Sequence, residues 1–278
     1  MKKMRYQSIN GHFFTKNQPY CCNRPIFCAN TNCTFLVGDQ PFLRLVKDRN
    51  LLGSLQFWIS VKERPLYFHD FSSIQFEYGA NFAQWELSDS RVEGKIVLYA
   101  AVPEKTEGFL VKIKPSRPME VYWQFGGLTY IPGQWNLSPM MHKELLYPEW
   151  KTENCKENQI WEQKGVWQLH GAKKQSPCVF LSYQNGTACI TTGPSLVGQA
   201  EIKEECLFLS VGLCPPLPFQ TSYLSALKRQ AQLEERFICH TPDSELDTQM
   251  KVLAAEIDGA WYPPRTMHSN ESWNAPYL

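Results

Sequence analysis

Residue types suited to holding a sugar gather at the end of the chain, in MHSNESWNAPYL (267–278). His268, Glu271 and Trp273 stand close together there, and Trp261 precedes them. Aromatic rings pack on the C–H faces of pyranose rings, and neighbouring polar groups orient the hydroxyls. We therefore take these four residues as candidates for substrate binding. The alternative for Trp261 is that it only packs its helix against the rest of the molecule.

A second group of the same residue types lies in the long segment 128–158, LTYIPGQWNLSPMMHKELLYPEWKTENCKEN. Trp135 and His142 are its candidate binding residues. A segment of this length inside a compact domain is usually functional or locally folded. The alternative, which the sequence leaves open, is an insertion that only covers the edge of a sheet.

Carboxylates are the residues that would have to do chemistry on a sugar. Cleavage of a glycosidic bond normally needs two of them at a set separation, one as acid and one as base or nucleophile. Glu256 and Asp258 are two residues apart on an expected helix, so they point in different directions. Glu271 is a single carboxylate on a terminal segment. The sequence also lacks the G-x-S-x-G, P-loop and H-E-x-x-H signatures, so the catalytic residues stay unknown.

The charge balance argues against a nucleic-acid partner. The chain has 28 Lys and Arg against 27 Asp and Glu, and no stretch concentrates the basic residues. No apolar run approaches the roughly 20 residues that a membrane span needs. We therefore expect neither nucleic acid nor a membrane span.

The ten cysteines do not form a metal-binding pattern. There is no C-x-x-C pair and no His at zinc-finger spacing, so no metal or other cofactor is expected. Cysteines inside apolar runs, as in CLFLSVGLC (206–214), are interpreted as small buried hydrophobic residues. Their disulfide status stays open.

The first 215 residues show the alternation typical of β-strands. In GSLQFWISV (53–61), Leu55, Phe57 and Ile59 fall on one side and the residues between them on the other. Turns with Gly, Pro or Asn separate the strand-like stretches, which are 53–61, 73–80, 82–89, 93–103, 108–116, 119–127, 159–170, 178–186, 187–193 and 206–213. Many short strands at this spacing predict a mainly β fold, a large antiparallel β-sandwich of two broad sheets.

The pattern changes to a helical one after PPLP (215–218). The segment 219–237 has Phe219, Tyr223, Leu227 and Ala231 at helical spacing, with many charges opposite. The sandwich is therefore expected to lead into a linking helix.

A second helix is expected after residue 240. Thr241 suits the N-cap and Pro242 the first helical position, and the pair Pro263–Pro264 should end the helix. Its expected apolar stripe consists of Leu246, Met250, Leu253, Ile257 and Trp261. This helix begins a further structural part.

Four motifs carry a likeness to a known family: RPIFCANTNCTFLVGDQPFLRL (24–45), VYWQFGG (121–127), ENCKENQIW (153–161) and TPDSELDTQMKVLAAEIDGAWYPPRTMHSNESWNAPYL (241–278). With them, the chain resembles an uncharacterised bacterial family of six-hairpin glycosidase-like proteins, found in polysaccharide-degrading bacteria. The resemblance implies a galactose-mutarotase-like β-supersandwich over residues 1–215 and a helical linker over 216–240. Residues 241–278 would then be the first helix and loop of a truncated (α/α)6 toroid.

The same resemblance implies a carbohydrate-active, glycoside-hydrolase-like protein. Its ligand would be an oligo- or polysaccharide, and its partner its own C-terminal helical domain if the gene continues. The chain alone is expected to be inactive, because such enzymes place their acid on a later helix. The alternatives are a non-catalytic carbohydrate-binding module and a structural or interaction module. The protein would be periplasmic or secreted if a signal was removed, and cytoplasmic otherwise.

Overall fold

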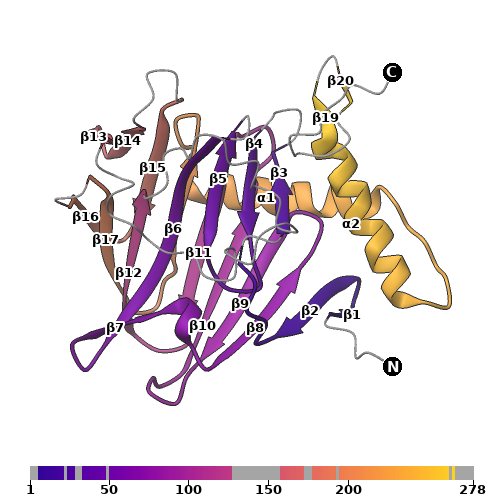
Figure 1. Cartoon of the computed structure of the whole chain (residues 1–278), viewed down its shortest axis with the longest axis horizontal. Coiled ribbons are helices and arrows are strands. Elements are labelled where there is room, and N and C mark those ends of the chain that lie inside the picture. Colours follow the sequence, from indigo (N-terminus) through magenta and orange to yellow (C-terminus); the bar gives the residue numbers. More distant parts are fainter. Residues whose placement is uncertain are drawn as a thin grey trace.

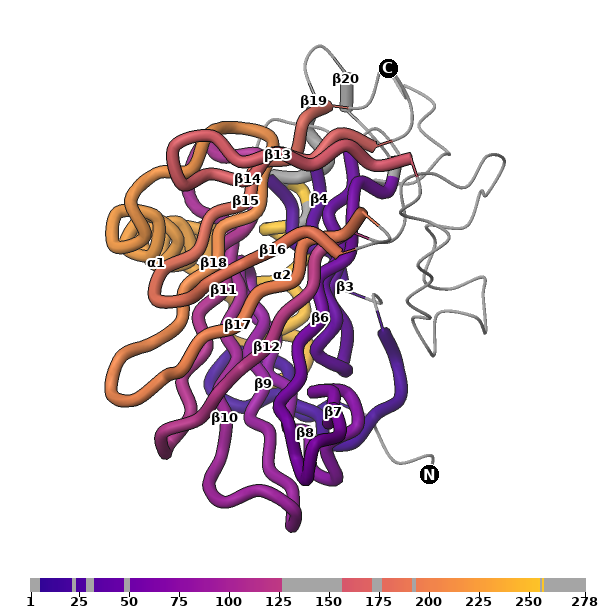
Figure 2. Tube along the Cα trace, turned by 90° about the vertical axis from the view of Figure 1, so that its left-hand side faces the viewer, coloured from indigo at the N-terminus to yellow at the C-terminus, as the bar shows by residue number. Residues whose placement is uncertain are grey.

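The computed structural model describes residues 6–21, 24–28, 33–47, 50–126, 157–171, 177–191, 194–262 and 265–266. Over these residues the chain is mainly β, with two large antiparallel sheets followed by two helices, which confirms the predicted fold class. In Figure 1 one sheet lies in front of the other, and Figure 2 shows the same layers edge-on.

The larger sheet, sheet A, has ten strands among the described residues. In spatial order they are β1 (Gln7–Ile9), β2 (His12–Lys16), β8 (Ser73–Tyr78), β9 (Phe82–Ser88), β10 (Lys95–Ala101), β11 (Gly108–Pro115), β18 (Leu207–Gly212), β15 (Val179–Gln184), β14 (Val166–His170) and β13 (Gln159–Gln163). Adjacent strands are antiparallel throughout.

The smaller sheet, sheet B, has eight strands among the described residues. In order they are β16 (Thr187–Ile190), β17 (Leu196–Ile202), β12 (Met119–Gly126), β6 (Asn50–Val61), β5 (Leu43–Lys47), β4 (Cys33–Val37) and β3 (Arg24–Phe27), with β7 (Arg64–Tyr67) paired to β6. A short 3-10 turn, η1 (Phe68–Asp70), follows β7. Two short strands near the end, β19 (Trp261–Tyr262) and β20 (Arg265–Thr266), pair with each other.

The core lies between the sheets and explains the alternation. Phe57 of β6 and Trp123 of β12 are register partners and are fully buried, and Phe76 and Trp85 of sheet A belong to the same core cluster. A fully buried aromatic side chain contributes about 2–3 kcal/mol of apolar burial, so each strand keeps its large apolar residues on this side. The residues between them necessarily face outward.

Trp123 occupies space that a neighbouring side chain would otherwise fill. Its register partner on β17 is Gly198, and a Cβ atom at that position would overlap the Trp123 ring. Glycine at 198 is therefore needed for the indole to lie in the core, and no residue with a side chain fits there without moving the ring.

The predicted strand over 159–170 is in fact a hairpin, β13 and β14. Its turn is made by Lys164 and Gly165, which have φ angles of 54° and 76°. Both lie in the left-handed region that tight hairpin turns require.

Helix α1 (Phe219–Glu235) covers the outer face of sheet A (Figure 2). Ala226 of α1 packs on Phe82, Tyr99 and Ala101, the outward residues of β9 and β10, and Tyr223 lies beside them. The predicted stripe was partly wrong, because the buried side of the helix carries Ser222, Ala226, Arg229 and Leu233, whereas Leu227 is 38% exposed.

Helix α2 (Ser244–Ala260) lies beside β1 and β3 and ends before the proline pair. The N-cap prediction was wrong by two residues: Asp243 Oδ1 accepts the backbone N–H groups of Glu245 and Leu246. Thr241 instead donates its hydroxyl to Asp247. Asp243 is the N-cap residue because its carboxylate accepts hydrogen bonds from two free N–H groups at the positive end of the helix.

The apolar stripe expected on α2 was also wrong in its direction. Leu246, Leu253 and Ile257 are 42%, 41% and 71% exposed, while Thr248 and Val252 are buried. The helix is held by apolar packing of Val252 in the main core and by polar contacts, since Ser8 Oγ of β1 meets Thr248 Oγ1 and donates to Ser244 O. The side that packs is thus the one that matches the N-terminal strands.

Candidate functional site

Most of the residues expected to bind sugar cannot be placed. Trp135, His142, His268, Glu271 and Trp273 lie outside the described residues. The backbone of Trp261 forms β19 rather than the last turn of α2. The predicted site therefore stays a prediction.

One group of aromatic side chains lies on the outer face of sheet B. Trp58 of β6 is the register partner of Tyr122 on β12 and of Tyr67 on β7. The Trp58 ring stacks on Tyr122 with centroids 5.7 Å apart and an angle of 11°, and meets Tyr67 at 5.7 Å and 52°. We call Tyr67, Trp58 and Tyr122 the aromatic row. All three rings are half-buried and keep part of their surface exposed.

The inward neighbours of these residues force them outward. Phe57 and Trp123 occupy the core, so the pleat turns Trp58 and Tyr122 to the opposite face. This position of Trp58 was predicted from the alternation in 53–61. The contact of Trp58 with Tyr67 and Tyr122 was not predicted, because this contact depends on the register of three strands.

Two amide side chains lie next to the aromatic row on the same face. Gln56 and Gln124 are register partners, each two residues from a ring of the row, and Gln56 Nε2 donates to Gln124 Oε1 (3.2 Å). Gln124 Nε2 donates to Ser195 Oγ (2.8 Å), which also meets Thr191 Oγ1 at 2.8 Å. We call Gln56 and Gln124 the amide pair. The face thus combines rings with groups that both donate and accept hydrogen bonds.

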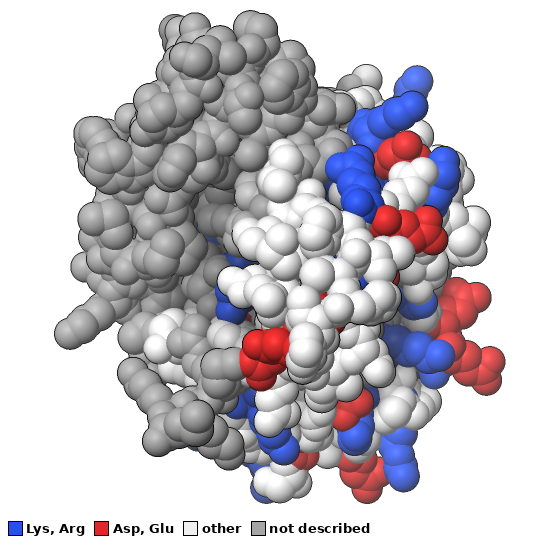
Figure 3. Space-filling view, turned by 90° about the vertical axis from the view of Figure 1, so that its right-hand side faces the viewer, with Lys and Arg blue, Asp and Glu red and all other residues white. Residues whose placement is uncertain are grey.

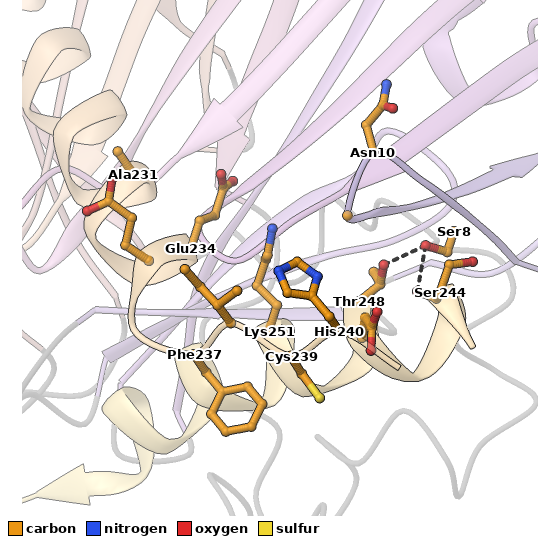
Figure 4. Close-up of a pocket in the computed structure, with 14 residues that line it drawn as sticks. Ser8, Asn10, Ala231, Glu234, Phe237, Cys239, His240, Ser244, Thr248 and Lys251 are labelled. Atoms are coloured by element: carbon orange, nitrogen blue, oxygen red, sulfur yellow. Dashed lines mark hydrogen bonds between the residues drawn. The ribbon is translucent and has the colours of Figure 1, made fainter. Parts of the chain in front are cut away.

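A second candidate is a pocket of about 610 Å³ between the β1–β2 turn, the end of α1 and the start of α2 (Figure 4). Its lining includes Glu234, Lys251 and Asp247. The pocket holds charges of both signs, and Lys251 helps to lower the pKa of Glu234. On the face of the molecule seen in Figure 3, basic and acidic side chains are likewise intermixed.

The acidic groups near this pocket are committed to structural contacts. His12 of β2 meets Glu234 Oε1 of α1 (3.2 Å) and Glu77 Oε1 of β8 (2.7 Å). The hydrogen bonds to Glu234 and then Glu77 raise the pKa of His12 to about 9, against the lowering effect of burial. His12 is therefore charged at neutral pH and ties α1 to sheet A.

These carboxylates are unsuited to act as the acid of a glycosidase. Such an acid needs a raised pKa, so that it is protonated near neutral pH. The hydrogen bond from His12 holds the pKa of Glu234 below its ordinary value. The pKa of Asp247 is also lowered, because its hydrogen bonds with Thr241 outweigh desolvation. The pocket offers no acid and base pair of the required kind among these residues.

The described part of the chain contains no cluster suited to a metal ion, because no three residues among its His, Cys, Asp and Glu come close enough together to hold one. Neither described helix combines the length and the apolar character that crossing a membrane requires.

No protein-family model matches this chain, and comparison with curated proteins gives no match either. The class of protein is thus defined by its fold, a mainly β two-sheet sandwich followed by two helices. The outer face of sheet B is the candidate functional site of this fold.

Proposed function

We propose that this chain binds carbohydrate through the outer face of sheet B and does not cleave glycosides by itself. It would be the sandwich and linker part of a carbohydrate-active, glycoside-hydrolase-like protein. The single observation that carries the proposal is the aromatic row of Tyr67, Trp58 and Tyr122 lying directly beside the amide pair.

The chemistry of a sugar supports this assignment. Pyranose rings have apolar C–H faces that pack on aromatic side chains, and hydroxyl groups that both donate and accept. Trp58 and Tyr122 offer the first kind of contact, and Gln124, the partly exposed member of the amide pair, offers the second on the same face, where the buried Gln56 holds it in place. Strands hold all four side chains, so little side-chain order has to be gained on binding.

The order of the structural parts supports the wider proposal of a glycosidase-like protein. A two-sheet sandwich leads into α1, which packs on sheet A, and then into α2. This is the order that the family resemblance implies for a supersandwich, a linker and a first toroid helix. The lowered pKa values of Glu234 and Asp247 support the absence of catalysis by the described part alone.

Binding to a panel of oligo- and polysaccharides, measured by isothermal titration calorimetry, tests the proposal. Trp58→Ala should weaken binding of the best glycan about tenfold or more, since loss of a buried aromatic contact at a site costs over ~1 kcal/mol. The matched control is Trp161→Ala. Trp161 is 37% exposed, lies on β13 of sheet A and stacks on His170, so its loss should leave glycan affinity unchanged.

Two results would contradict the proposal. One is the absence of measurable affinity for every glycan of the panel. The other is equal loss of affinity in both variants, which would show that the rings act only through general stability. Turnover of aryl glycosides by this chain would overturn the non-catalytic part.

A structural or interaction module is the second candidate, and one observation favours it. Leu246, Leu253 and Ile257 form an exposed apolar line on α2. Such a line is typical of a helix that packs against another protein part. Leu253→Glu would then disrupt association while leaving glycan binding intact, which separates the two candidates by size-exclusion chromatography and calorimetry.

A further inference from the structure

We propose that the glycan bound by sheet B carries an acidic group, a carboxylate or a sulfate, held by Arg44 and Ser54. This inference rests on the proposed function and adds the class of glycan. Arg44 of β5 and Ser54 of β6 are register partners on the outer face of sheet B. Ser54 is two residues from Gln56 on the same strand, so it continues the polar part of the site.

Arg44 and Ser54 are both buried, and each has a polar atom without a hydrogen-bond partner in the described part of the chain. Arg44 is 8% exposed and Ser54 1% exposed. Among the described residues, neither Arg44 Nε nor Ser54 Oγ has a hydrogen-bond partner, and no carboxylate forms an ion pair with Arg44. Thr34 Oγ1, on the adjacent strand β4 and the same face, is in the same condition.

Buried polar atoms without a hydrogen-bond partner destabilise a folded protein unless a ligand or solvent supplies the missing bond. A buried cation without a partner loses its hydration and gains no compensating charge. Buried polar atoms in native proteins are nearly always hydrogen-bonded. Single unsatisfied atoms also occur elsewhere, such as Ser182 Oγ on sheet A, but three of them on neighbouring strands of one face, one belonging to a cation, together indicate a ligand position.

The geometry of the side chains favours an anion. A guanidinium presents planar donors that match a carboxylate or a sulfate, and the serine hydroxyl adds another donor. The Arg44 guanidinium lies 5.4 Å from the centre of the Phe42 ring, which restrains its plane.

The distance to the aromatic row sets the minimum size of the glycan. Trp58 is four residues along β6 from Ser54, which corresponds to about 13 Å of extended strand. One sugar ring does not span this length. The ligand would be an acidic oligosaccharide with one ring on Trp58 and the acidic group of another at Arg44.

Matched acidic and neutral glycans test the inference. Galacturonate oligomers and their methyl esters differ in the carboxylate charge and the small ester methyl group, and dextran sulfate oligomers and dextran oligomers differ only in the sulfate. The protein should bind one acidic member about tenfold or more tightly than its neutral counterpart, since charge-assisted hydrogen bonds are strong. The pair that shows the preference identifies which anion is recognised.

Arg44→Met should remove this preference while leaving affinity for the neutral glycan in place. The control is Arg117→Met, because Arg117 forms an exposed ion pair with Glu93 and is not part of the proposed anion position, and it should keep the preference. Without ligand, Arg44→Met should unfold at the same or a higher temperature, whereas an arginine with a structural role would lower that temperature. Ser54→Ala is a second variant that removes an unsatisfied hydroxyl, and it should weaken acidic glycans several-fold.

Equal affinity for acidic and neutral glycans would overturn the inference but leave the proposed function standing. Retained preference in both Arg44→Met and Ser54→Ala would also overturn it. A lower unfolding temperature of Arg44→Met, with unchanged acid preference, would show that Arg44 serves the fold alone. Absence of binding to any of the four glycans and to the wider panel would remove the proposed function and the inference together.

Discussion

Each sheet holds a nearly buried arginine on its outer side, and the two have opposite surroundings. On the side of sheet A, Arg229 of α1 donates from Nη1 to Asn81 Oδ1 (2.6 Å), and Asn81 Nδ2 donates to the carbonyl oxygens of Val102 and Ala226. On sheet B, Arg44 stands beside Ser54 with its Nε unsatisfied among the described residues.

The outer face of sheet A is covered by helix α1. On the outer face of sheet B, by contrast, several buried polar atoms lack a hydrogen-bond partner among the described residues. Helix α1, His12 and Asn81 supply hydrogen bonds and apolar contacts over most of this face of sheet A, so that face serves stability, although the buried Ser182 Oγ of β15 has no hydrogen-bond partner there among the described residues. The outer face of sheet B keeps exposed rings and unsatisfied donors. Sites of function are where unfavourable local arrangements persist.

The strongest test of this contrast is the same substitution at both arginines. Arg229→Met should lower the free energy of unfolding by about 3 kcal/mol, because it leaves Asn81 without its charged donor in a buried position. Arg44→Met should change it by less than ~1 kcal/mol or raise it. Urea denaturation of both variants measures the difference, and equal losses would contradict the contrast.

The pH dependence of stability should differ between the two sides as well. The folded pKa of His12 is about 9, above its ordinary 6.5, so its contribution is complete below pH 6.5 and is lost as pH rises through about 9. We expect a loss of about 2 kcal/mol in the wild type that is absent in His12→Gln. Chemical denaturation between pH 6 and 10, taken as a difference between the two proteins, measures it.

His69, which stacks on Tyr67 beside sheet B, provides the control with the opposite sign. Burial lowers its folded pKa, so the unfolded chain takes up the proton first and stability falls as pH drops below 6.5. His69→Gln should flatten the curve on the acidic side only. A flattening on the alkaline side would contradict the assignment of the alkaline loss to His12.

The smallest expected effect compares two serines. Ser225 Oγ accepts the backbone N–H of Glu104 (2.9 Å), so Ser225→Ala should cost about 1 kcal/mol. Ser54→Ala removes a hydroxyl without a partner among the described residues and should cost less than ~0.5 kcal/mol or stabilise. Thermal unfolding of the two variants checks the order, and a larger loss for Ser54→Ala would contradict it.

The sequence predicted several strands that have one buried and one open face, but it missed β17, in which buried and exposed residues alternate just as clearly. Alternation was visible over 53–61 and 73–80 because only one side of each strand meets the core. Strand β4 went unrecognised, since all five of its residues are buried. Its outward Leu36 packs with Phe42 and Val46 in a second apolar cluster, so the period of two disappears from the sequence.

The helices were predicted, but the direction in which they face was not. Apolar spacing in α2 indicated Leu246 and Leu253, whereas Thr248 is the buried residue that meets Ser8. Helical period identifies a face only when that face meets an apolar core. On α2 the packed side is mixed, because Val252 joins the apolar core while Thr248 meets the polar end of β1.

The outer face of sheet B could not be predicted as a site because its residues are distant in sequence. Tyr67, Trp58 and Tyr122 come together through register, and nothing in their local sequence marks the pairing. The unsatisfied state of Arg44 is equally invisible, since it depends on what the neighbouring strands do not offer.

The absence of a side chain at Gly198 affects the position of the outward-facing rings on the other side of sheet B. Residue 198 has no side chain, so the indole of Trp123 settles against bare backbone, and the adjacent Tyr122 is carried on the same stretch of β12. Even alanine at 198 would push the indole and tilt the phenol beside Trp58. The position of the outward ring of Tyr122, and so its contact with a ligand, thus depends on the missing side chain of Gly198 on the core side of sheet B.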